Sequence, residues 1–109
     1  MEKLFVYGSL QPGGSNEQVL AAIDGRWEPA TVKGSLLDRG WGASLGYPGL
    51  VLDASGGDVR GYAFFSSKLT SKWSQLDEFE GEEYERKIAS VTLQSGDEVL
   101  ANVYVLRYL

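Results

Sequence analysis

Glu80 is the residue whose position best suits proton-transfer chemistry. The spacing predicts a helix over 68–80. Leu69, Trp73 and Leu76 share its apolar face. At about 100° per residue, Glu80 falls roughly 20° from Leu69 and so points the same way. Burial and the negative end of a helix dipole both disfavour a carboxylate, so the pKa of Glu80 should rise from its usual ~4.3 toward the range of a general acid/base. The alternative is that the helix frays early and that the acidic run around Glu80 is a solvated face.

The segment from Gly8 to Ser15 is a second place where chemistry could occur. It contains Gly8, Pro12, Gly13 and Gly14 between an expected strand and an expected helix. Free main-chain N–H groups in such a turn, together with a helix N-terminus, favour an anion such as a carboxylate. The segment lacks the Gly-Lys-Ser/Thr ending of a phosphate-binding loop and does not match G-x-G-x-x-G, so nucleotide binding is not predicted. The alternative is an ordinary connecting loop.

The sequence contains no His and no Cys. These absences exclude a Ser-His-Asp triad, a thiol nucleophile, a disulfide framework, and metal sites built on imidazole or thiolate. The side chains that remain for proton transfer are those of Asp, Glu, Lys and Tyr.

The charge balance excludes other classes of function. Ten Lys and Arg residues are scattered among 15 Asp and Glu, for a net charge of −5, which argues against a nucleic-acid partner. The apolar run that ends at Tyr7 is too short for a signal peptide, and no run approaches the ~18 residues of a membrane span. We therefore expect a single domain over 1–109, located in the cytoplasm, with no membrane contact.

Short strands with two helices make up the expected fold. Ser15 and Gln18 fit a capping box for the first helix, Ser66 or Ser67 can cap the second, and Gly81 ends it. The expected strands are 4–7, 31–38, 50–52, 59–65, 84–93 and 98–106, and the expected helices are 16–23 and 68–80. So many short strands favour an α+β fold, a small mixed sheet that curls or closes into a barrel with two helices.

Three segments resemble the gamma-glutamylcyclotransferase-like family. Residues 4–10, LFVYGSL, are similar to its opening strand and loop. Residues 76–81, LDEFEG, followed by YER at 84–86, are similar to its catalytic segment. YPG at 47–49 is similar to a loop of many small members. The order and spacing agree over nearly the whole chain, and the pattern is similar to that of small bacterial-type and gamma-glutamylamine cyclotransferase-like members.

The resemblance implies a curled sheet or barrel, a fold with a pocket beside the first strand. It implies that Glu80 is the catalytic general acid/base, with no metal and no cofactor. It further implies that Tyr84 lines the pocket and that the substrate's glutamyl head group is held by the loop residues, largely through main-chain amides. These loop residues are Tyr7, Gly8, Ser9 and Leu10.

The reaction implied by the resemblance is that of a gamma-glutamyl cyclotransferase, an acyltransferase or lyase. The α-amine of a small γ-glutamyl amide attacks its own γ-carbonyl, which yields 5-oxoproline and a free amine or amino acid. Leu10 stands where the animal glutathione-pathway enzymes have Asn, which leaves open whether the leaving group is an amino acid, a polyamine or lysine side-chain amine, or an antibiotic-type amine. The alternative function is a non-catalytic module that binds a small carboxylate in the same pocket.

Overall fold

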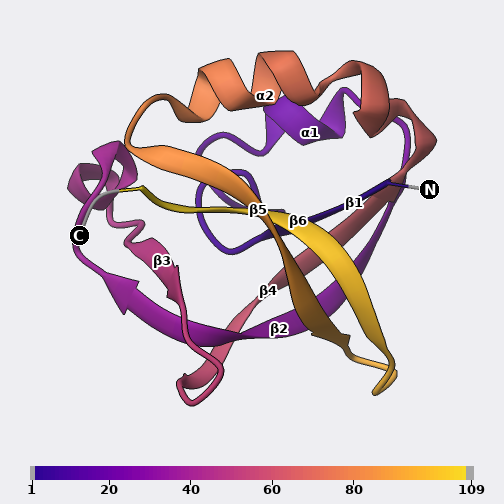
Figure 1. Ribbon diagram of the computed structural model, residues 1–109. Coiled ribbons are helices and arrows are strands. Elements are labelled where there is room, and N and C mark those ends of the chain that lie inside the picture. The colour runs from indigo at the N-terminus through magenta and orange to yellow at the C-terminus, as the bar shows by residue number, and fades with distance from the viewer. Residues whose placement is uncertain (1, 108–109) are drawn as a thin grey trace.

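Five strands of a mixed sheet close into a barrel, as the strand pattern predicted (Figure 1). The computed structural model describes residues 2–107. The barrel order is β2-β4-β1-β6-β5, and β5 pairs again with β2. All of these pairs are antiparallel except β1–β6, which is parallel. The strands are β1 (Glu2–Val6), β2 (Arg26–Leu37), β3 (Gly49–Leu52), β4 (Gly57–Ser66), β5 (Tyr84–Leu93) and β6 (Glu98–Leu106). The extra strand, β3, pairs with the end of β2.

Two apolar clusters lie on opposite sides of the barrel wall. Phe5 belongs to the cluster that includes Val32, Val91 and Val103. Its neighbours Leu4 and Val6 belong to the cluster that includes Leu20, Leu69 and Leu76 from the helical segments. Because successive side chains of a strand point to opposite faces, β1 is buried on both. This accounts for its uninterrupted apolar run.

The first helix is shorter than predicted, and its predicted cap is wrong. The α-helix α1 covers Gln18–Ala21, its N-cap is Glu17, and no side chain caps it. The Ser15 amide instead donates to the Tyr47 hydroxyl, and the Asn16 amide donates to the Ser9 carbonyl. These long-range hydrogen bonds hold the chain in a turn where a capping box would have started the helix.

The second helix is divided into two parts. A 3₁₀ helix, η2, covers Ser67–Ser71, and α2 covers Trp73–Glu80. The predicted cap at Ser66 is confirmed, because its hydroxyl accepts from the Lys68 amide. The predicted end is also confirmed, since Gly81 adopts a φ of 83°, which favours glycine. In Figure 1, α2 and α1 lie together across one side of the barrel.

Several strands also differ from the predicted boundaries. Strand β1 covers Glu2–Val6 rather than 4–7, and β4 covers Gly57–Ser66 rather than 59–65. Strand β2 begins at Arg26 rather than 31, passing through Pro29. The Pro29 carbonyl accepts from the amide of Gln94, just beyond the end of β5. The Pro29 nitrogen lies on the same edge of the strand, away from β4. Proline is therefore tolerated, because its missing N–H takes no hydrogen bond from the β2–β4 ladder. The predicted loop before β3 contains a short 3₁₀ helix, η1 (Trp41–Leu45). Within residues 2–107, no helix has the length and apolar character needed to cross a bilayer.

A buried tyrosine hydroxyl joins β3 to the barrel. Tyr7, directly after β1, donates to the Tyr104 carbonyl of β6 at 2.8 Å and accepts from the Leu50 amide of β3 at 3.0 Å. Burial raises the pKa of Tyr7 far above its usual value, so this hydroxyl stays protonated. The hydroxyl therefore connects two strands that are not paired in the sheet.

We predict that Tyr7→Phe lowers the free energy of unfolding by about 1–3 kcal/mol, because the Leu50 amide and the Tyr104 carbonyl both lose a partner. Urea denaturation measures the change. Tyr62→Phe on β4 is the matched control, since the Tyr62 hydroxyl makes no hydrogen bond within residues 2–107 and its loss should cost little. Equal stability of the two variants would contradict the bridging role of Tyr7.

Candidate active site

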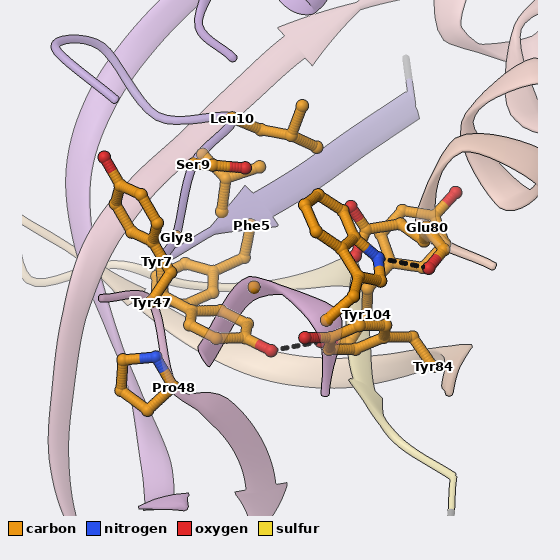
Figure 2. Close-up of a pocket in the computed structure, with 13 residues that line it drawn as sticks. Phe5, Tyr7, Gly8, Ser9, Leu10, Tyr47, Pro48, Glu80, Tyr84 and Tyr104 are labelled. Carbon is orange, nitrogen blue, oxygen red and sulfur yellow. Dashed lines mark hydrogen bonds between the residues drawn. The ribbon is translucent and has the colours of Figure 1, made fainter. Parts of the chain in front are cut away.

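A pocket opens between the loop that follows β1 and the C-terminal end of α2 (Figure 2). Its free space, which includes open solvent at the mouth, is about 430 Å³, and the volume accessible to the centre of a water molecule is about 40 Å³. Every residue predicted for the site lines this pocket, and so do several that the sequence analysis did not name. The lining residues are Phe5, Val6, Tyr7, Gly8, Ser9, Leu10, Trp41, Gly42, Tyr47, Pro48, Glu80, Tyr84 and Tyr104.

Glu80 reaches the pocket from the last turn of α2. Leu76 lies one turn earlier and is buried, so the apolar face carries Glu80 inward even though the helix is interrupted at Lys72. Burial raises the pKa of Glu80 to about 7. Its carboxyl group has no ion-pair partner and no hydrogen bond to any of residues 2–107. A carboxyl group in this state can gain and lose a proton near neutral pH.

Tyrosines surround this carboxyl group, and no cation does. Tyr7, Tyr84 and Tyr104 come from three different parts of the barrel. Burial raises the pKa of each, and the negative charge of Glu80 adds to the effect. No Lys or Arg of the described chain lines the pocket. The hydroxyl groups therefore remain neutral at physiological pH, and nothing nearby stabilises the ionised form of Glu80 by charge.

The loop opposite Glu80 is rigid and presents main-chain donors. Asn16 holds Ser9 twice, with its amide on the Ser9 carbonyl at 2.8 Å and its Nδ2 on the Ser9 Oγ at 3.0 Å. A Cβ at Gly14 would lie 2.4 Å from the Ser9 carbonyl oxygen, so only glycine allows this approach. The amides of Gly8, Ser9 and Leu10 donate to no acceptor within residues 2–107. They are free to bind an anionic ligand group.

Residues 40–48, which we call the aromatic strap, close one side of the pocket. Trp41 donates from Nε1 to the Glu80 carbonyl at 2.7 Å. Its ring also makes edge contacts with Phe79 and Tyr84. At the other end, the Tyr47 hydroxyl accepts from the amide of Ser15, the last residue of the segment 8–15, which we call the glycine loop; the distance is 3.1 Å. The strap thus contacts both the carboxyl side and the amide side of the pocket.

Sequence reasoning did not assign Trp41, Tyr47 or Tyr104 to the site. The sequence predicts a glycine-rich loop here. Its two signals are the pair of aromatic residues among glycines in GWGASLGYPG at 40–49 and the YPG at 47–49 that resembles a family loop. Tyr104 lies in β6. The alternation along this strand predicts that Tyr104 is part of the sheet, but it does not show which other segment the Tyr104 side chain contacts. The arrangement as a whole can bind a small amino-acid-like ligand and move protons on it through Glu80.

Comparison with solved structures places this architecture among known folds. YkqA from Bacillus subtilis is similar, with 27% sequence identity and a TM-score of 0.74, covering 98% of this chain but only 36% of YkqA. An AIG2-like protein from Mus musculus shares the fold at 24% identity and a TM-score of 0.74, covering 100% of this chain and 80% of that one. A gamma-glutamyl cyclotransferase from yeast, described as specific to glutathione, shares the fold at 14% identity and a TM-score of 0.61, covering 95% and 68% of the two chains.

Sequence comparison gives the family. No curated protein sequence matches significantly. The sequence model of the family described as "Gamma-glutamyl cyclotransferase, AIG2-like" matches residues 4–108, which is nearly the whole chain. The chain spans only about a third of YkqA, so the activity of that longer protein is not transferred to it. By this match, the chain belongs to the AIG2-like gamma-glutamyl cyclotransferase family.

Proposed function

We propose that the protein is a gamma-glutamyl cyclotransferase that releases 5-oxoproline from a small γ-glutamyl amide. The observation that carries this proposal is the pairing, in one pocket, of Glu80 without a cationic partner and the free amides of Gly8, Ser9 and Leu10. A γ-glutamyl group offers the complementary features, an α-carboxylate for the amides and an α-ammonium for Glu80.

Glu80 serves as the general acid/base in this proposal. Its carboxylate takes a proton from the α-ammonium of the bound substrate, and the free amine attacks the γ-carbonyl carbon. A bond forms between the α-nitrogen and that carbon, and the original amide C–N bond breaks. Glu80 passes this proton to the leaving nitrogen and takes up the second proton of the α-nitrogen, which yields 5-oxoproline and a neutral amine. The proton left on Glu80 is then released to the amine or to solvent, which regenerates the carboxylate. A pKa of about 7 suits both transfers at neutral pH.

The nucleophile belongs to the substrate, so the enzyme needs no Ser, Cys or His for covalent catalysis. Its task is to hold the γ-glutamyl chain in a ring-closing conformation, which the rigid loop and the aromatic strap support. Tyr84 is the candidate donor to the developing oxyanion. Its raised pKa keeps the hydroxyl protonated, and that hydroxyl donates no hydrogen bond within residues 2–107.

The lining also bears on the leaving group. An amino-acid leaving group brings a second carboxylate, and the described lining has no cationic side chain to receive it. The pocket next to Trp41, Tyr47 and Pro48 is aromatic and apolar, which suits an alkylamine. Among the possible leaving groups, this favours an amine over an amino acid.

We predict that the protein forms 5-oxoproline from a panel of γ-glutamylamines and γ-glutamyl amino acids, with the amines turned over faster. Glu80→Gln should lower kcat/KM by about 100-fold or more, because general acid/base catalysis contributes that much. The assay is quantification of 5-oxoproline. Glu78→Gln, on an exposed position of the same helix, is the matched control and should leave the rate unchanged.

Two outcomes would contradict the proposal. If Glu80→Gln is as active as the wild type, Glu80 is not the acid/base. If the wild type binds γ-glutamyl compounds in calorimetry but releases no 5-oxoproline from any of them, the protein is the carboxylate-binding module instead.

The pH dependence of activity follows from the pKa of Glu80. Because the ionised form accepts the substrate proton, kcat/KM should fall about tenfold per pH unit below roughly pH 7. A series of initial rates between pH 5 and 8 measures this limb. An acid limb centred near the ordinary carboxyl pKa of ~4.3 would mean that the working carboxyl group is solvated.

The same pKa predicts a change in stability. Its folded value, about 7, lies above the ordinary value of 4.5, so the protonated form is favoured by folding. The stability that Glu80 contributes relative to the Glu80→Gln variant is therefore lost as pH rises from about 4.5 through about 7. At pH 7 this loss amounts to roughly 3 kcal/mol. Glu80→Gln should thus be more stable than the wild type at pH 8, and the two should be nearly equal at pH 4. Thermal denaturation at both pH values measures the difference, and a constant difference would contradict the burial of Glu80.

A further inference from the structure

A polar cluster joins α2 to the barrel beside the pocket, and the proposed chemistry does not use it. We call it the Arg86 cluster, and its members are Trp73, Asp77, Arg86 and Asn102. Arg86 of β5 donates from Nε to Asp77 Oδ1 at 2.9 Å and from Nη2 to Oδ2 at 3.3 Å. Such a two-point pair fixes orientation as well as distance. Arg86 also donates from Nη1 to Asn102 of β6 at 3.2 Å, and Asn102 donates to the Lys3 carbonyl of β1 at 3.1 Å.

The guanidinium group of Arg86 contacts α2 at two positions one turn apart. Besides the Asp77 carboxylate, it stacks on the Trp73 ring, with Cζ 4.4 Å from the ring centroid. Trp73 is itself held by a hydrogen bond from its Nε1 to Glu2 at 3.1 Å. Arg86, which lies on β5, therefore joins α2 directly to β6 and, through Asn102 and Trp73, to β1.

Asp77 transmits this contact to the last turn of the helix, which carries Glu80. The Asp77 carbonyl accepts from the Gly81 amide at 3.0 Å, in the hydrogen bond that ends α2 directly after Glu80. The Asp77 carboxylate also accepts from the Tyr104 hydroxyl at 2.7 Å, and Tyr104 lines the pocket. Main chain and side chain of Asp77 thus hold this turn at the pocket wall.

We propose that Arg86, acting through Asp77, is a positioning residue that keeps the carboxyl group of Glu80 inside the pocket. The inference rests on the proposed function, since it assigns Arg86 a task in the same reaction. Arg86 does not itself line the pocket and takes part in no proton transfer. Its task is to hold the acid/base at its distance from the amides of the glycine loop, where a misplacement of about 1 Å can cost 100-fold in rate.

Loss of a nearby positive charge and loss of position change the pKa of Glu80 in opposite directions, so an experiment can tell the two effects apart. The titratable groups that face Glu80 are Tyr7, Tyr84 and Tyr104, while Asp77, Glu78, Glu82 and Glu83 are the other carboxylates of its helix and the turn that follows. Removing a nearby cation would raise the pKa of Glu80. Loosening the last turn admits water, which lowers that pKa toward 4.5, because burial is the cause of its elevation.

The test uses two conservative variants. Arg86→Lys keeps the positive charge but loses the two-point contact, and Asp77→Asn keeps the shape and an acceptor for Tyr104. We expect kcat to fall by about 10- to 100-fold in each, with KM changed by less than about threefold. Asp58→Asn, in the exposed Lys33–Asp58 pair that joins β2 to β4, is the matched control and should leave kcat unchanged.

The pKa of Glu80 gives a readout that a purely stabilising ion pair would not move. Carboxyl carbon NMR titration of the protein labelled at Glu, with Glu80→Gln assigning the signal, should show the pKa of Glu80 falling from about 7 in both variants. Circular dichroism at the assay temperature confirms that each variant is folded. If Arg86→Lys unfolds, the kcat of Asp77→Asn carries the test, because loss of the Asp77 charge by itself also lowers the pKa of Glu80.

Unchanged kcat and an unchanged or raised pKa of Glu80 in the folded variants would overturn the positioning role. Failure of the proposed function is distinguishable, because it appears as a wild type that releases no 5-oxoproline. The NMR titration needs no substrate and in that case still decides whether Arg86 and Asp77 hold Glu80 in the pocket.

Discussion

The structure of the site depends on the burial of one carboxyl group without a compensating charge. Glu80 lies at the end of α2, where apolar and aromatic side chains exclude water and no described cation is near. An ion pair would stabilise the anion and return its pKa to a low value, which would make it a poor proton acceptor at neutral pH. In the proposed function, a lining without a cation among the described residues keeps Glu80 a proton acceptor near neutral pH. The expected cost is lower stability of the folded protein in neutral solution.

The barrel explains why this carboxyl group and the free amides line the same pocket. Strand β1 is central, paired on both edges and buried on both faces, so its end is rigid. The loop that leaves it begins with Tyr7, whose hydroxyl reaches both β3 and β6. The glycine loop therefore starts from a fixed point, and Asn16 and Gly14 set its course from there. A chain segment with little regular structure is positioned by its anchors.

The aromatic strap and the Arg86 cluster hold Glu80 from two directions. Trp41 hydrogen bonds to the Glu80 carbonyl, a group at the helix end that has no partner within the helix. Asp77, one turn earlier, is held by Arg86 and Tyr104. Backbone and helix are both restrained, while the carboxyl group itself makes no hydrogen bond with the described chain and is left to the ligand.

The sequence by itself determined the elements and the direction in which Glu80 points. The hairpin of β5 and β6 has its predicted boundaries, because alternation along those strands is a local property. Glu80 points inward as predicted even though the helix is interrupted at Lys72, because Leu76 and Glu80 lie one turn apart within the same α-helix. Local motifs of a few adjacent residues each also indicated the family.

Only the tertiary structure decided what those elements face. The cap at Ser15 was lost because Tyr47, 32 residues away, takes its amide. Tyr7 and Tyr104, 97 residues apart, meet because β1 and β6 pair in parallel, and no local pattern shows which strands become neighbours. The strap, Tyr104 and the Arg86 cluster belong to the site through contacts between distant segments. Such contacts depend on which strands pair when the barrel closes. Periodicity along the chain predicts the strands but not their pairing.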